Sequence, residues 1–183
     1  SAGGGRPGHP ARRSGDVTVP RRAPEGYSRL QIRLHWIVVG VVALQYALHD
    51  GVASAFDRGM EAGALTLSAP VVGHFVAGSA IFLLAAWRLL LRQERGAPEP
   101  PSEDPGWQRA LARGTHLAMY ALMLTLPITG GAAWAMASEG ASTAHEVMRA
   151  LLLLAIGLHV AGALYGQFVQ KTGILDRMRR PAD

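Results

Sequence analysis

The sequence contains no cysteine, and this absence excludes several kinds of site. Disulfides, iron–sulfur clusters, thiolate zinc sites and haem attached through a C-x-x-C-H motif all need cysteine sulfur. Any cofactor must therefore be held by histidine, methionine or oxygen ligands. Charged residues are also few, at 17% of the chain, whereas hydrophobic residues make up 49%. This balance is ordinary for a membrane protein.

Four apolar segments have the length of membrane-spanning helices. Each contains close to the ~20 residues that cross a ~30 Å hydrocarbon core, and none has the pattern of a strand. They cover residues 30–49, 70–91, roughly 110–136 and about 145–169. The connections are polar, at residues 50–65, 92–109 and 137–142. The expected fold class is all-α, an integral membrane four-helix bundle.

The flanking charges predict domain limits and topology. Residues 1–26 are rich in Gly, Pro and Arg and are expected to form a disordered basic arm before a transmembrane domain at 27–180. All of the 18 basic residues except Arg58 and Arg149 lie in or beside this arm, the central connection or the tail. The positive-inside rule then places both termini in the cytoplasm. The chain has a net charge of +5, and its basic residues lie at the borders of the apolar segments, as in a membrane protein. Nucleic acid is therefore not expected as a partner.

Histidines recur in and at the ends of the apolar segments. His145 and His159 are fourteen residues apart, which corresponds to about 21 Å along one helix face. Ionisable residues within a membrane usually have a function. At matching depths, His145 faces His74 or His49, and His159 faces His35 or His116. The seventh histidine, His9, lies in the arm.

Haem b, held without covalent attachment, fits between two imidazoles on facing helices. Two axial histidines leave iron no open position and favour electron transfer. Zinc is a weaker interpretation because each pair supplies only two ligands, and copper lacks cysteine or a supporting methionine cluster. A cofactor-free bundle with polar contacts between helices is the remaining alternative.

Four motifs resemble the bacterial cytochrome b561 family. They are YSRLQIRLHW (27–36), GHFVAGSAIFLLAAWRLLLR (73–92), HLAMYALMLTLPITG (116–130) and HEVMRALLLLAIGLH (145–159). The resemblance covers residues 27 to about 180 and implies two b haems in a four-helix membrane protein. It implies that the axial iron ligands are the pairs His35–His159 and His74–His145. His116 matches a family histidine and is expected to be a hydrogen-bonding neighbour of haem or quinone, whereas His49 matches none.

The family exchanges electrons with the quinone pool, and some members oxidise superoxide with ubiquinone as acceptor. The resemblance therefore implies an oxidoreductase or electron-transport cytochrome in the bacterial inner membrane, with quinone, lipid and a periplasmic redox partner. The outer connections are acidic, which favours a basic redox protein over superoxide. An alternative is a haem b membrane-anchor subunit of a larger oxidoreductase, such as a hydrogenase or formate dehydrogenase.

Overall fold

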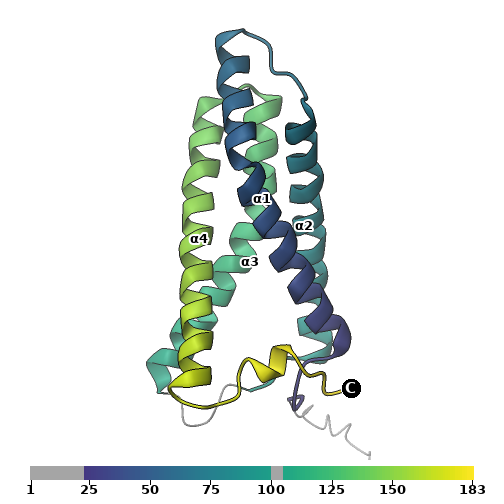
Figure 1. Cartoon of the computed structure of the whole chain (residues 1–183), viewed down its shortest axis with the longest axis vertical. Helices are drawn as coiled ribbons and strands as arrows, with labels where there is room; N and C mark the ends of the chain where they lie inside the picture. The colour runs from purple at the N-terminus through teal and green to yellow at the C-terminus, as the bar shows by residue number, and fades with distance from the viewer. Residues whose placement is uncertain (1–22, 100–104) are drawn as a thin grey trace, which may run out of the picture.

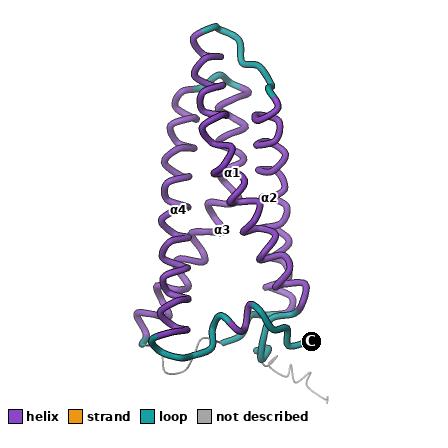
Figure 2. Tube along the Cα trace, in the orientation of Figure 1, coloured by secondary structure: helices purple, strands orange, loops and turns teal. Residues whose placement is uncertain are grey.

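Four long helices make up almost all of the part of the chain that the structure describes, residues 23–99 and 105–183 of a computed structural model. They are α1 (Arg29–Glu61), α2 (Ala69–Arg95), α3 (Gly106–Ala135) and α4 (Glu139–Phe168), followed by a short 3-10 turn at Asp176–Met178. These residues contain no strand (Figures 1 and 2). All four helices are long and apolar enough to cross a membrane. The predicted all-α membrane bundle is confirmed. Most of the predicted arm, residues 1–22, lies outside the described residues.

Local signals in the sequence explain where the helices begin and end. Ser28 and Gln31 form a capping box at the start of α1, with each side chain accepting a hydrogen bond from the other residue's backbone N–H. A proline stands in the first turn of α2, where its missing N–H costs nothing. Gly96 ends α2 with φ of 82°, a conformation that favours glycine. Ser138 caps α4 by accepting from the Ala141 N–H.

The helices extend beyond the predicted apolar segments, most of all at two places. α1 continues to Glu61 through residues expected to form a polar loop, and α4 begins at Glu139, before the predicted start near His145. An apolar window marks only the part of a helix that lies in lipid, because a helix can extend into water with polar residues. Phe56, in the extension of α1, is buried, and its ring centroid lies 5.7 Å from that of Trp134 at the end of α3.

Few side chains are fully buried between the helices, and the outer surface of the bundle is apolar. The close backbone packing joins α3 to α4, α1 to α2 and α2 to α3. The central apolar cluster draws on all four helices, through Val38, Val42, Ile81, Ala85, Met123 and Leu152. Many large apolar side chains point outward, among them Leu117, which is 71% exposed. Such a surface suits lipid, where an exposed leucine loses nothing.

One end of the bundle holds the start of α1 and the C-terminal segment, and the other holds the α1–α2 and α3–α4 connections (Figure 1). The C-terminal segment returns to the start of α1, where Met178 accepts a hydrogen bond from the Trp36 indole at 3.0 Å. The Ala182 N–H donates to the Tyr27 carbonyl at 3.1 Å. Burial raises the pKa of the Tyr27 phenol, against the opposing effect of the nearby Arg92, so the phenol stays neutral. We call the end of the bundle that holds the start of α1 the basic end, because five arginines of α1 and α2 lie nearest to it: Arg29, Arg33, Arg88, Arg92 and Arg95.

Candidate functional site

Two pairs of histidines face each other across the bundle. The ring centroids of His35 on α1 and His159 on α4 are 6.3 Å apart. Those of His74 on α2 and His145 on α4 are 6.2 Å apart. Because His145 and His159 share α4 and are separated by fourteen residues, the pairs lie at two levels, about 21 Å apart along the helix. The structure thus brings together the four histidines that the family resemblance implies as ligands.

The separation within each pair matches two imidazoles on opposite sides of one metal ion. An imidazole nitrogen binds a first-row metal at about 2 Å, and the ring centroid lies about 1 Å behind that nitrogen, so opposed rings are centred about 6 Å apart. The observed 6.3 and 6.2 Å agree with this value. His116 and His159 are closer, at 5.0 Å between centroids, which is short for opposed ligands of one metal. By ring separation, His35 is therefore a better candidate than His116 for a metal ligand opposite His159.

His145 is oriented by the backbone of α3. Its Nδ1–H donates to the Leu126 carbonyl at 3.0 Å, which leaves Nε2 unprotonated and able to bind a metal. The Thr129 hydroxyl lies 3.3 Å from the same Nδ1 and donates to the same carbonyl at 3.0 Å. A methyl group at Gly130 would lie only 3.0 Å from Cε1 of His145. The absence of a side chain at Gly130 therefore lets the ring lie against the α3 backbone.

His116 is held in the same way within its own helix. Its Nδ1–H donates to the Ala112 carbonyl at 2.7 Å, because a carbonyl oxygen can only accept. Nε2 is then an acceptor, and the ring lies edge-on to His159. The expectation that His116 is a hydrogen-bonding neighbour of haem or quinone stays a prediction.

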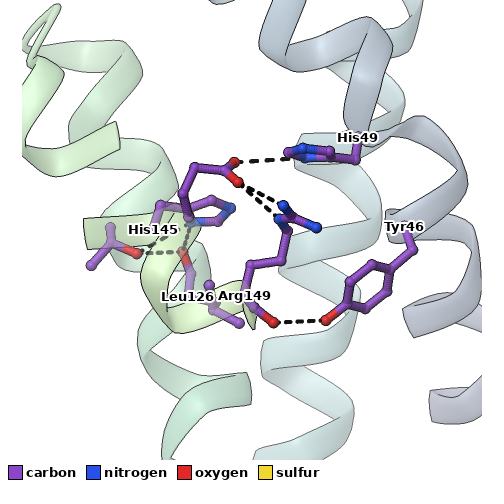
Figure 3. A network of polar contacts seen from close by, with 7 residues as sticks. Tyr46, His49, Leu126, His145 and Arg149 are labelled. Carbon is purple, nitrogen blue, oxygen red and sulfur yellow. Dashed lines mark hydrogen bonds and ion pairs between the residues drawn. The ribbon is translucent and has the colours of Figure 1, made fainter. Parts of the chain in front are cut away.

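His49 belongs to a polar network beside His145 (Figure 3). Its Nδ1 lies 3.6 Å from a Glu146 carboxylate oxygen. The other oxygen of Glu146 accepts from Arg149 at 2.8 and 3.0 Å. Tyr46 donates its hydroxyl hydrogen to the Arg149 carbonyl at 2.9 Å, and the Arg149 guanidinium carbon lies 5.8 Å from the Tyr46 ring centroid. The network joins α1 to α4, and His49 is paired with a carboxylate within it.

Each pair offers only two histidine ligands, and this fits a metal whose other ligands belong to a cofactor. Within residues 23–99 and 105–183, no group of three or more His, Asp or Glu side chains could hold a metal ion. A tetrahedral zinc site needs at least three such ligands. Two imidazoles, with the tautomer fixed at His145, are instead a ligand set that would hold a haem iron. The residues present therefore fit haem b.

Several residues of the site were not identified from the sequence. The charge pattern singled out Arg149 only as an exception, and no role was predicted for Glu146, whereas both lie in α4. Their spacing of three residues within an apolar helix is a signal that predicts an ion pair. Gln45 and Thr129 gave no comparable signal, because their contacts depend on how neighbouring helices are rotated.

Comparison with known proteins gives a consistent result. A family model described as prokaryotic cytochrome b561 matches residues 26–181. The chain is 34% identical over 160 residues to a protein of Cereibacter sphaeroides named cytochrome b562, covering 85% of this chain and 96% of that protein. It is 26% identical to cytochrome b561 homolog 1 of Escherichia coli K12, covering 83% and 96%. It is 28% identical to the probable superoxide oxidase CybB of Yersinia pestis, covering 83% and 94%.

Proposed function

Because the chain belongs to the prokaryotic cytochrome b561 family, we propose that it binds two b haems and exchanges electrons between the quinone pool and a redox partner on the periplasmic side. Family membership itself establishes a bacterial membrane protein of electron transport that uses haem b. The number of haems, their ligands, the quinone and the partner are the proposed part.

The observation that carries the proposal is the presence of two histidine pairs, each with a ring separation of just over 6 Å. We assign His35 and His159 to one iron and His74 and His145 to the other. Haem b, when bound, supplies one-electron redox chemistry, and two imidazole ligands leave the iron no position for oxygen. The helices hold the four rings and fix the His145 tautomer through the Leu126 carbonyl.

The charge of the surface at the end of the bundle opposite the basic end indicates which kind of redox partner binds there. Acidic residues outnumber basic ones there, with Arg58 and Arg149 against Asp50, Asp57, Glu61, Glu139 and Glu146. A negative surface attracts a basic redox protein and repels an anion. Superoxide, named for the Yersinia relative, is the second candidate. The acidic surface makes a basic protein the better candidate here.

The experiment that tests this function is anaerobic mixing of the purified chain with a short-chain ubiquinol. We expect the haem absorption to change to the reduced form, and a basic c-type cytochrome to reoxidise it more slowly as salt is raised. Reduction by dithionite combined with no reduction by ubiquinol would contradict the proposal. That outcome would favour the alternative, a haem b anchor subunit that needs the other subunits of a hydrogenase-like or formate dehydrogenase-like complex.

The orientation follows from the basic end, which we place in the cytoplasm. Arg29, Arg33, Arg88, Arg92 and Arg95 all lie in the parts of α1 and α2 nearest this end. A fluorescent protein that matures only in the cytoplasm, fused after Asp183, should be bright, and alkaline phosphatase at the same place should be inactive. The reverse pattern would place the His74–His145 pair nearer the cytoplasm.

A further inference from the structure

Two buried polar atoms lack a hydrogen-bond partner in the part of the chain that the structure describes, and they belong to residues in contact. They are Oε1 of Gln45 on α1 and Nδ1 of His74 on α2. The Nε2 atom of Gln45 already donates to the His74 carbonyl at 3.1 Å. One atom is an acceptor and the other is a donor when the ring carries its proton there. Buried polar atoms without partners are rare and require an explanation.

A histidine that binds a metal through one ring nitrogen usually donates from the other nitrogen to a carbonyl or carboxylate oxygen. His145 meets this condition through the Leu126 carbonyl. His74 has no equivalent contact, although its ring opposes that of His145 at 6.2 Å. If His74 binds iron through Nε2, its Nδ1–H needs an acceptor, and Gln45 provides an unused one.

The glycine one turn after His74 makes room for this amide. A methyl group on Gly78 would lie 3.1 Å from Nε2 of Gln45, which is tighter than an ordinary contact. Because Gly78 has no side chain, the Gln45 amide can lie against α2 at the level of His74. One bridging water can join two buried polar atoms of this kind.

We propose that Gln45 is the positioning residue for His74: its amide oxygen accepts the Nδ1–H hydrogen bond, directly or through one water, while its Nε2 holds the His74 backbone. The inference rests on the proposed function, because it takes His74 as an iron ligand. An acceptor at Nδ1–H makes the imidazole a more basic ligand, which stabilises ferric iron and lowers the reduction potential of that haem.

The test is Gln45→Met, which keeps the length of the side chain and removes the acceptor. We expect both haems to be retained and the ratio of reduced to oxidised haem in the His74–His145 site to rise about tenfold at fixed potential, equivalent to 59 mV for one electron. The g-values of that ferric haem in electron paramagnetic resonance should shift as well. The matched control is Gln31→Met, since Gln31 on α1 also donates to a carbonyl, that of Gly96 after the end of α2. It should leave this site unchanged.

Gln45→Glu separates a positioning role from a structural one. It loses the Nε2 bond, as Gln45→Met does, but keeps an oxygen acceptor, so the potential should fall instead of rising. This variant also covers the case in which Gln45→Met does not fold. Unchanged potential and g-values in Gln45→Met, or a rise in both variants, would overturn the inference. The site is identified first as the haem that His74→Ala loses; if His74→Ala keeps both haems, the ligand assignment fails, independently of Gln45.

Discussion

Replacing His74 with alanine should remove one of two haems, whereas replacing His49 with alanine should leave both in place. Both histidines lie on the side of the bundle that faces His145, and their positions in the sequence alone do not decide between them. In the structure, the His74 ring opposes that of His145 at 6.2 Å, whereas His49 is paired with the Glu146 carboxylate. Without His74, the protein would supply that iron with only one imidazole, and a haem that is not covalently attached would then be lost.

The other pair provides the same contrast. His159→Ala should remove the second haem and leave the His74–His145 site intact, whereas His116→Ala should retain both haems, because its ring lies too close to His159 to oppose it across a metal. Haem content and the reduced spectrum of each purified variant are the measurements. Two haems in His74→Ala with one in His49→Ala would place the site between α1 and α4. One haem in His116→Ala with two in His35→Ala would change the partner of His159.

The membrane architecture could be predicted because lipid imposes a minimum length on each apolar segment. The helix ends could not be predicted as well, since α1 leaves the apolar window near His49 and continues as a helix to Glu61. In that extension, the buried Phe56 of α1 lies near Trp134 of α3, so the extended part of α1 packs against another helix. A window of hydropathy contains no information about such contacts.

The histidines of the site could be predicted in part. Their depth follows from the helical rise, so His159 was restricted to His35 or His116. Depth alone does not choose between these two, and the family resemblance implied His35; the ring separations of 6.3 Å and 5.0 Å, which depend on the rotation and spacing of the helices, favour the same residue. The contacts of His145 with Leu126 and of Gln45 with His74 could not be predicted for the same reason. Both are hydrogen bonds to a backbone carbonyl, which every residue has, so no residue type indicates them.

The haem content of the purified chain tests the central claim most directly. Each histidine pair has the ring separation expected for two imidazoles on one iron, so the account predicts about two haems b per polypeptide in a pyridine haemochrome assay, both low-spin. Low-spin signals in electron paramagnetic resonance should account for all the iron. A ratio near one, or a high-spin signal of comparable size, would contradict the claim, because one of the two pairs would then not be a bis-histidine site.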